Sequence, residues 1–595
     1  MSTAIVTGQP VPGSSLEHDL RSLGFDVCVA ADAAEAETVL AAVPADRRVA
    51  LVDARFVGHP HALRLGLTDP RFPLSAVPGA VTAQPAARPA LTRALAREAS
   101  AGGGTAVAVD SLADRAVTAL AADGADVHRP ELGSLVAAVP ADPQARNEAR
   151  QAVAAVDDEA VRLKSAVKSR DGFFTTFFIS PYSRYLARWC ARRGLTPNQV
   201  TTASLLTALV AAGCAATGTR AGFVAAGVLL IASFVLDCTD GQLARYALKY
   251  STLGAWLDAT FDRAKEYAYY AGLALGAARG GDDVWALALG AMVLQTCRHV
   301  VDFSFNEANH DATANTSPTA ALSDRLDGVG WTVWVRRMIV LPIGERWAMI
   351  AVLTAATTPR ITFYALLAGC AFAATYTTAG RVLRSVTRKA RRTDRAAQAL
   401  ADLADNGPLA TFVARATPGR LGAAPLVALA GAAVLAVSLF SGVTWAPVAG
   451  AVVYTITSGQ ALYRPLKGPL DWLLPPLFRA AEYGTVLVLA DRAGVNGALP
   501  AAFGLVAAVA YHHYDTVYRI RGNAGAPPAW LVRSIGGHEG RTLLVTVLAA
   551  VLTASQFKVA LTVLAVAVAL VVLAESIRFW VSAGAPAVHD EGEPA

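Results

Sequence analysis

Charged residues are scarce in this chain. Asp, Glu, Lys and Arg make up 16% of its 595 residues, whereas 54% of the residues are apolar. From about residue 198 onward, apolar runs of roughly 18 or more residues recur, and each is long enough to cross a bilayer as a helix. We count about twelve such runs, so the sequence predicts a largely membrane-embedded protein.

Cysteine is also rare. The six cysteines are scattered, with no CxxC pair and no close cluster of Cys and His, so neither a disulfide framework nor a zinc site is predicted. The first 30 residues lack the basic start and apolar core of a secretory signal peptide. We therefore expect the N-terminus to stay in the cytoplasm.

The formal net charge of +6 does not predict a nucleic-acid partner, because the basic residues cluster beside apolar runs. This placement follows the positive-inside pattern of membrane proteins. Segments 188–193, 245–249 and 381–392 are expected to be cytoplasmic, whereas the loop that contains Asp282 and Asp283 is expected outside.

An acidic motif lies between residues 237 and 262, where the chain reads DCTDGQLARYALKYSTLGAWLDATFD. Asp237 and Asp240 are three residues apart, and Asp258 and Asp262 are four apart, so each pair projects from one face of its own helix. Two such helices side by side would direct four carboxylates toward one point. Hard divalent cations are the natural counter-ions, so the motif predicts a two-metal site.

The alternative interpretation is that these aspartates lie on the protein surface, paired with nearby basic residues. It is disfavoured because both helices continue into apolar stretches, where an unpaired carboxylate is costly. The charge distribution places both carboxylate pairs at the cytoplasmic ends of their spans.

The pattern DxxDGxxARx(8)GxxxDxxxD is the signature of the CDP-alcohol phosphatidyltransferase family, which the sequence resembles over about residues 168–392. The resemblance includes the stretch TPNQVT at 196–201. It implies transfer of a phosphoalcohol from a CDP-alcohol donor to a hydroxyl acceptor, with release of CMP. It also implies two divalent ions, Mg²⁺ or Mn²⁺, as cofactors. The expected location is the cell membrane, with several spans and the active site on the cytoplasmic side.

The same resemblance assigns roles to residues of the motif. Asp237, Asp240 and Asp258 are expected as metal ligands, and Asp262 is expected at or beside the second metal and as the general base. The residues expected at the nucleotide are Gly241, Ala244, Arg245, Gly254 and Asn198. Close helix packing alone would account for the small residues among them equally well. Arg245 could instead pair with a ligand aspartate, and Asn198 could be an N-cap of the first span.

The acceptor pocket is less determined. Arg336, Arg337 and Arg346 flank one predicted span and would suit a phosphorylated acceptor such as an inositol phosphate. The positive-inside rule explains the same arginines without a ligand. His299 and Asp302 are polar residues in an apolar run, where a buried hydrogen-bonded pair is a more frequent explanation than support of the site.

Residues 1–145 alternate short apolar runs with amphipathic stretches, the pattern of a soluble α/β domain. In chain order this resembles bifunctional enzymes in which a cytidylyltransferase precedes di-myo-inositol-phosphate-phosphate synthase. The segment from Gly8 to Ser15 does not reproduce the glycine-rich loop of nucleotidyltransferases, and Asp53 is interpreted as a cap or turn former in preference to a metal ligand. We expect a cytoplasmic domain that is degenerate as a nucleotidyltransferase.

The rest of the chain is predicted in four parts. Residues 146–195 form a connector and an interfacial amphipathic helix, residues 196–392 a six-helix transferase domain, residues 393–419 a cytoplasmic linker, and residues 420–595 a second six-helix membrane domain. The expected fold is thus a mainly α-helical polytopic membrane protein of about twelve transmembrane helices in two six-helix halves, preceded by a soluble α/β domain.

The second half echoes the first in the same order. VLDCTDGQLARY is matched by VYTITSGQALYR, and FDRAKEY by FRAAEY. Ser458 stands where Asp240 does, and Phe478 falls where Asp262 would. We interpret the second half as a degenerate repeat without metal ligands, so that the protein is either a homodimer or an internal pseudo-dimer.

The expected partners are a CDP-alcohol donor, a hydroxyl acceptor and membrane lipid, with no nucleic acid, and the product is a phospholipid or an inositol phosphodiester. Two other functions stay open. A bifunctional cytidylyltransferase and transferase would show CTP turnover by isolated residues 1–150. A non-catalytic scaffold or transporter is disfavoured because transporters place their polar site near the bilayer midplane.

Overall fold

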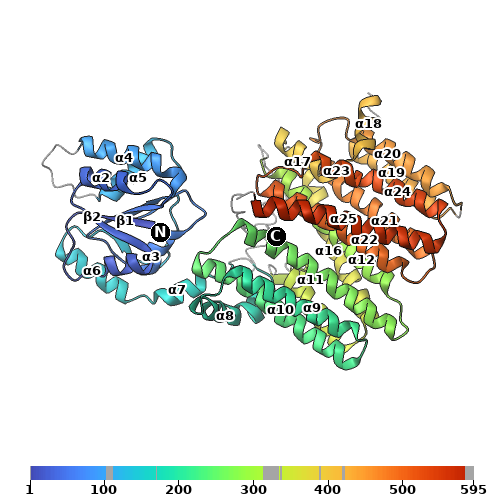
Figure 1. Ribbon diagram of the computed structural model, residues 1–595, viewed down its shortest axis with the longest axis horizontal. Coiled ribbons are helices and arrows are strands. Elements are labelled where there is room, and N and C mark those ends of the chain that lie inside the picture. Colours follow the sequence, from blue (N-terminus) through green and yellow to red (C-terminus); the bar gives the residue numbers. More distant parts are fainter. Residues whose placement is uncertain are drawn as a thin grey trace. The chain divides into compact units, whose positions relative to one another are not determined.

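The computed structural model describes residues 2–101, 111–168, 171–311, 334–335, 338–387, 390–417, 422–441 and 443–582 (Figure 1). The chain divides into two compact units. The first comprises Met1–Ser169, Tyr182–Pro197 and Thr239–Ser251, and the second comprises Arg170–Pro181, Asn198–Cys238 and Thr252–Ala595.

The N-terminal part of the first unit is built on a five-stranded sheet in the order β2-β1-β3-β6-β5. Its strands are β1 (Ser2–Thr7), β2 (Phe25–Ala30), β3 (Val49–Asp53), β5 (Leu74–Val77) and β6 (Ala80–Ala83). Strand β1 pairs parallel with β2 and β3, whereas β6 runs antiparallel to both β3 and β5. The tight turn between β5 and β6 contains Gly79 at φ +77°, a conformation that favours glycine.

Helices cover both faces of this sheet. Successive residues of each strand point to opposite faces, so the sheet contributes side chains to two hydrophobic cores. Ile5 and Leu51 pack in one core with α2 (Ala33–Ala42), α4 (Arg88–Ala101) and α5 (Leu112–Ala122). Ala4 and Val52 pack in a second core with α1 (Leu16–Ser22) and α3 (Pro60–Thr68). The prediction of an N-terminal α/β region is confirmed.

Asp53 is the last residue of β3. Its carboxylate accepts hydrogen bonds from the backbone N–H of Arg55 at 2.8 Å and from Nη2 of the same residue at 2.9 Å. Asp53 therefore forms a local turn, as the sequence predicted. A two-stranded sheet of β4 (Val57–Gly58) and β7 (Ala137–Ala138) completes the strands of the described residues.

Three helices follow this domain: α6 (Pro143–Ala154), α7 (Asp158–Ser165) and α8 (Ser180–Arg192). In α8 the aromatic side chains of Tyr182, Tyr185 and Trp189 are exposed. An exposed aromatic face is what a helix at a membrane surface needs, and the interfacial role of α8 stays a prediction.

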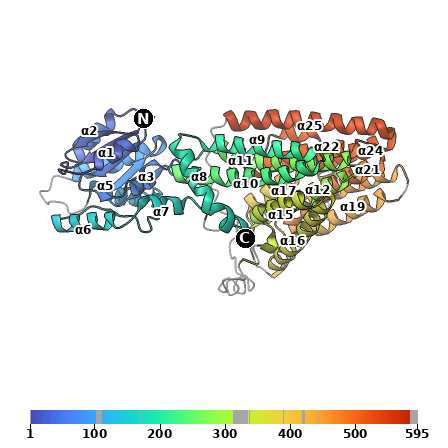
Figure 2. The same ribbon diagram turned by 90° about the horizontal axis from the view of Figure 1, so that it is seen from below.

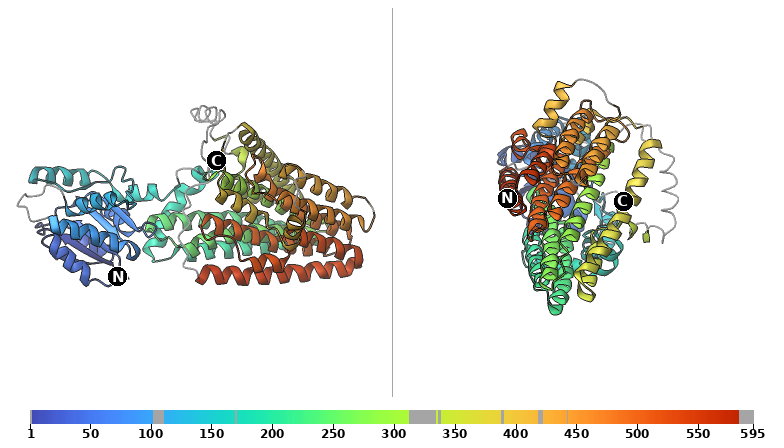
Figure 3. Two further views of the ribbon diagram at one scale, coloured as in Figure 1. Left: turned by 90° about the horizontal axis from the view of Figure 1, so that it is seen from above. Right: turned by 90° about the vertical axis from the view of Figure 1, so that its right-hand side faces the viewer.

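The second unit is a helical bundle (Figure 2; Figure 3). Its first set of helices is α9 (Pro197–Ala216), α10 (Arg220–Ala247), α11 (Thr252–Arg279), α12 (Trp285–Asn309), α15 (Ile343–Ala356) and α16 (Pro359–Thr387). Its second set is α19 (Ala424–Leu439), α20 (Ala446–Ala461), α21 (Leu474–Arg492), α22 (Ala498–Arg521), α23 (Ala529–Ile535), α24 (Gly537–Val551) and α25 (Ala554–Ser582). The last turns of α10 group with the first unit.

The two sets share one hydrophobic core. Tyr270 and Trp347 of the first set belong to the same buried cluster as Phe503 and Tyr514 of the second. Helix α12 packs against α21 and α22, which joins the two sets. The segment expected as a linker, 393–419, forms α17 (Asp394–Ala404) and α18 (Pro408–Ala416).

The prediction of about twelve spans is only partly supported. Within the described residues, five helices are long and apolar enough to cross a membrane by length and composition: Pro197–Ala216, Arg220–Ala247, Pro359–Thr387, Asp471–Arg492 and Ala554–Ser582. Helices α15, α20 and α24 have 14 to 16 residues. Helices α11, α12 and α22 are longer but contain charged residues that the bundle buries.

Candidate metal centre

The acidic motif lies on two consecutive helices, as predicted. Helix α10 contains Asp237 and Asp240, and α11 contains Asp258 and Asp262. The connection between the helices is short, and it includes Leu248 at φ +51°. A residue in this left-handed region turns the chain sharply, so α11 can return beside α10.

Three of the four carboxylates converge. One oxygen from each of Asp237, Asp240 and Asp258 lies within 4.8 Å of the others. Asp240 is buried, and the other two are half-buried. Three carboxylates at this spacing repel one another unless a cation neutralises them, and oxygen ligands suit Mg²⁺ and Mn²⁺. The residues therefore fit a divalent ion, whose identity the donor set does not select.

Asp262 has a different partner. Its Oδ1 forms an ion pair with Nζ of Lys265 at 2.9 Å, and the same ammonium group contacts Asp237. Lys265 is fully buried and also donates to Oγ of Ser204 at 3.2 Å. A buried ammonium between two carboxylates supplies one of the positive charges that the four aspartates require.

From the sequence, Lys265 is expected only among the basic residues that could pair with surface aspartates, and not in the site. Its spacing of three residues from Asp262 places the two side chains on the same helix face, and this spacing was the available signal. The partner on α10, Asp237, could not be identified without the packing of α11 against α10.

The next polar layer is an ion-pair network centred on Glu266. Its carboxylate accepts from Nε and Nη2 of Arg346 at 3.0 and 3.3 Å, from Nη1 of Arg263 at 3.0 Å and from the hydroxyl of Tyr270 at 2.6 Å. Glu266 and Arg346 are both buried. This network fixes the part of α11 that follows Asp262.

The residues expected at the acceptor fall into two groups. Arg346 pairs with Glu266, so its guanidinium already has a buried partner. Arg336 and Arg337 lie outside the described residues. Acceptor binding by these three arginines stays a prediction.

The residues expected at the nucleotide lie on the same helices as the aspartates or at the start of α9. Asn198 is the second residue of α9, and Gly241, Ala244 and Gly254 are half-buried. A Cβ atom added at Gly241 would lie 3.5 Å from Nη1 of Arg245, an ordinary contact distance. Gly241 is therefore not required by packing against that side chain.

Arg245 connects the end of α10 to the helices that follow the α/β domain. Its Nε donates to the backbone carbonyl of Ala166 at 2.6 Å. Next to it, the carbonyl of Tyr246 accepts from Nε of Arg162 at 2.8 Å, and the hydroxyl of Tyr246 donates to Glu159 at 2.8 Å. Helix α7 thus holds the segment that directly follows the DGxxAR sequence.

His299 and Asp302 are hydrogen-bonded, but to different partners. Nδ1 of His299 lies 2.6 Å from the hydroxyl of Tyr514, and Asp302 pairs with Arg381. Both contacts link the fourth helix of the first set to another helix of the bundle. Both residues thus make internal polar contacts, each with its own partner and not as the expected pair.

Two family models match separate parts of the chain. Residues 194–374 match the family described as CDP-alcohol phosphatidyltransferase. Residues 394–595 match a family of unknown function (DUF5941). The second match begins at the first residue of α17, so α17 and α18 fall within it together with the second set of helices.

Curated relatives are similar to parts of the chain. The chain is 37% identical over 131 residues to the phosphatidylinositol phosphate synthase of Streptomyces avermitilis, which covers 21% of this chain and 51% of that protein. It is 31% identical over 113 residues to the archaetidylinositol phosphate synthase of Pyrococcus horikoshii, covering 19% and 58%. It is also 31% identical over 114 residues to the bifunctional IPC transferase and DIPP synthase of Aquifex aeolicus, covering 19% and 26%.

The chain therefore spans less than two thirds of the length of each of these relatives. The match to the CDP-alcohol phosphatidyltransferase family and the converging aspartates both lie in the first set of helices. The likeness to the CDP-alcohol phosphatidyltransferase family lies in residues 194–374, which is less than half of the chain.

Proposed function

We propose that this protein is a membrane transferase that moves a phosphoalcohol group from a CDP-alcohol donor to a hydroxyl acceptor and releases CMP. The observation that carries the proposal is the convergence of Asp237, Asp240 and Asp258 within 4.8 Å inside the segment that matches the transferase family. Five apolar helices of spanning length support a membrane location.

In this proposal Asp237, Asp240 and Asp258 hold divalent ions, with Asp262 beside them. Such ions would neutralise the diphosphate of the donor and the charge on the departing CMP. Asp262 accepts the proton of the acceptor hydroxyl. Lys265 holds the carboxylate of Asp262 in place through its 2.9 Å contact and thereby acts as a positioning residue.

For the acceptor we propose a phosphorylated polyol of the inositol phosphate class. The names of two of the relatives, phosphatidylinositol phosphate synthase and archaetidylinositol phosphate synthase, contain this group. Because Arg346 is engaged by Glu266, the arginines better suited to a phosphorylated acceptor are Arg336 and Arg337.

We further propose that both sets of helices cross the membrane, with the aspartates toward the cytoplasm. The basic residues that flank the spans support this orientation. Buried ion pairs on these helices, Glu266 of α11 with Arg346 and Asp515 of α22 with Arg519, lower the cost of placing charged residues in a membrane.

The C-terminal half is proposed to be a degenerate copy of the transferase half. On the third helix of each half, an arginine and a glutamate three residues apart form an ion pair: Arg263 with Glu266, and Arg479 with Glu482. In each half the glutamate also pairs with an arginine of a later helix, Arg346 or Arg541.

A second parallel concerns the fourth helix of each half. Asp302 of α12 pairs with Arg381 of α16, and Asp515 of α22 accepts from Ser576 and Trp580 of α25 at 2.8 and 2.7 Å. In both halves the aspartate joins the fourth helix to the last. The copy is proposed to be catalytically silent because Ser458 and Phe478 stand in place of two aspartates.

One group in the C-terminal half has metal-ligand residue types. Asp405, His512 and His513 have ligand atoms within 4.8 Å of one another, and all three are buried. However, Arg479 and Arg541 both pair with Asp405. Two guanidinium groups beside the carboxylate already neutralise it and disfavour a divalent cation there.

The test is CMP release by the full chain in detergent with Mg²⁺ or Mn²⁺. The donors are CDP-diacylglycerol and CDP-inositol, and the acceptors include inositol 1-phosphate. We expect release that needs metal, one donor and one acceptor, and that is lost in Asp258→Asn. The control is Asp394→Asn, whose side chain is exposed and lies outside the aspartate group. Release that is independent of metal, or unchanged in Asp258→Asn, would overturn the proposal.

A further inference from the structure

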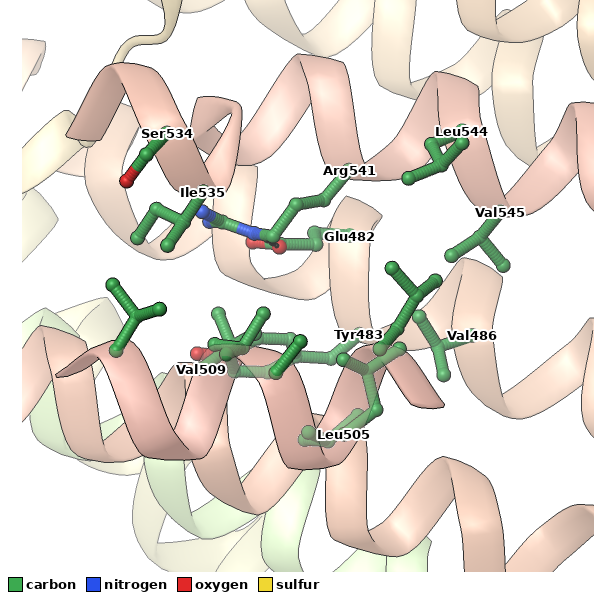
Figure 4. Close-up of a pocket in the computed structure, with 15 residues that line it drawn as sticks. Glu482, Tyr483, Val486, Leu505, Val509, Ser534, Ile535, Arg541, Leu544 and Val545 are labelled. Carbon is green, nitrogen blue, oxygen red and sulfur yellow. Dashed lines mark hydrogen bonds and ion pairs between the residues drawn. The ribbon is translucent and has the colours of Figure 1, made fainter. Parts of the chain in front are cut away.

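The C-terminal half contains a cavity of about 180 Å³ among α21, α22, α23, α24 and α25 (Figure 4). Most of its lining is aliphatic, including Val486, Leu505, Val509, Val545 and Val568. An engineered apolar cavity of about 150 Å³ stays dry and binds small hydrocarbons. A cavity of this size and lining is therefore a site for hydrocarbon and a poor site for water.

One end of the cavity is polar. Arg541 and Glu482 line it as an ion pair, and Figure 4 shows both side chains directed into the space between the helices. Arg541 is 7% exposed. Its Nε contacts Glu482, and its Nη2 donates to Asp405 at 2.6 Å. Within the described part of the chain, its Nη1 has no hydrogen-bond partner.

A buried hydrogen-bond donor without a partner raises the free energy of the folded state, so an acceptor near Nη1 of Arg541 would be stabilising. The charges around it limit what that acceptor is. Arg541 and Arg479 are balanced by Asp405 and Glu482, which pair with them. Because this cluster has no excess positive charge, a neutral oxygen acceptor such as a carbonyl fits better than a fully charged group.

The cavity also has an opening. Leu544 of α24 and Val571 of α25 line it and are nevertheless 43% and 38% exposed. Helix α25 is one of the five apolar helices of spanning length, and most of its apolar residues are not buried inside the bundle. In a membrane this surface would face lipid, so the opening between α24 and α25 would lead to the hydrocarbon layer.

We propose that this cavity binds the carbonyl-proximal part of one acyl chain of a membrane glycerolipid, whose ester carbonyl accepts a hydrogen bond from Nη1 of Arg541, while the rest of the chain leaves through the opening between α24 and α25. The hydrocarbon fills the aliphatic part, and the carbonyl meets the one unsatisfied donor at its polar end. The site lies in the half that lacks the metal aspartates, and it does not depend on the proposed transferase activity.

The test uses the full chain in lipid nanodiscs that contain a phosphatidylglycerol with a photoactivatable diazirine in one acyl chain. After illumination, mass spectrometry locates the crosslinked residues. We expect labelling of Leu544 and Val571, and at least a fivefold loss of this labelling in Val568→Trp, which places an indole in the cavity. The control is Val566→Trp on the same helix, because Val566 is 54% exposed and does not line the cavity.

A second cavity-filling variant separates the effect of filling the cavity from the effect of misfolding. Leu505→Phe fills the cavity from α22, and size-exclusion chromatography and circular dichroism report whether each variant is folded. Loss of labelling in either folded variant, with labelling kept in Val566→Trp, is the expected result. Labelling that persists at the wild-type level in the folded variants, or that is equally strong along the outer face of α25, would overturn the proposal.

The carbonyl contact has its own test. An ester-linked lipid and an ether-linked lipid of equal chain length compete against the diazirine probe in nanodiscs. The ether linkage lacks the carbonyl acceptor, so we expect the ester-linked lipid to displace the probe at a severalfold lower concentration. Equal displacement by both lipids would refute the hydrogen bond to Arg541.

Discussion

Replacing Lys265 by methionine should weaken the first set of helices in a way that divalent metal partly reverses. Lys265 is fully buried, and its ammonium group contacts Asp237 and Asp262. Methionine has similar length but no charge. It would leave two carboxylates without the cation that now lies between them.

The expected size follows from measured losses at buried ion pairs. Removing one partner of such a pair costs about 3–5 kcal/mol, because the other charge stays buried. In a domain of about 150–250 residues, 1 kcal/mol corresponds to about 2–4 °C in Tm, so the lower figure predicts a fall of about 6–12 °C. A divalent ion bound by the aspartates would return part of the missing positive charge.

The assay is thermal unfolding of the full chain in detergent, with EDTA or with Mg²⁺. Lys265→Met should unfold about 6–12 °C below the wild type in EDTA, and Mg²⁺ should raise its Tm more than that of the wild type. Lys467→Met is the matched control, because Lys467 forms an exposed pair with Asp394 at 2.7 Å, and such pairs contribute at most about 1 kcal/mol. Equal Tm values in EDTA, or equal stabilisation by Mg²⁺, would refute the reasoning.

Two further predictions concern buried charge. Glu266→Gln should lower the free energy of unfolding by about 3–5 kcal/mol, since it leaves Arg263 and Arg346 without their carboxylate, and Glu482→Gln should cost a similar amount in the second half. Denaturant titration measures both losses, and a loss below about 1 kcal/mol in both variants would contradict the expectation. In the α/β domain, burial together with the nearby charges of Arg162 and Arg64 lowers the pKa of His61 to about 4. The unfolded chain then binds more protons below pH 6.5, so the domain should lose up to about 3 kcal/mol of stability as the pH falls from 6.5 to 4. Hydrogen exchange of β1 and β3 in the full chain measures this loss, and an unchanged pH dependence in His61→Phe would rule out His61 as its cause.

The sequence predicted those features that depend on local spacing. The four aspartates, three and four residues apart, were assigned to two helices, and the structure brings Asp237, Asp240 and Asp258 together. The α/β domain followed from its alternating apolar pattern, and the turn at Asp53 followed from its place at a strand end.

Features that depend on packing between distant segments could not be predicted. Asp405 lies in the segment expected as a linker, yet it is buried against His512, His513 and Arg541. Charged residues such as Glu266 lower the hydropathy of a candidate span. In the structure they are neutralised by partners up to 80 residues away in the sequence. A hydropathy pattern contains no information about such partners.

The most direct test of the metal site is Mn²⁺ binding to the full chain, followed by electron paramagnetic resonance, in parallel with CMP release from CDP-diacylglycerol. Asp240 is the most buried of the three converging aspartates, so Asp240→Asn should abolish both Mn²⁺ binding and CMP release, whereas Asp394→Asn should keep both. Wild-type Mn²⁺ affinity in Asp240→Asn, or CMP release that persists in it, would contradict the assignment of the aspartates as the metal centre of a transferase.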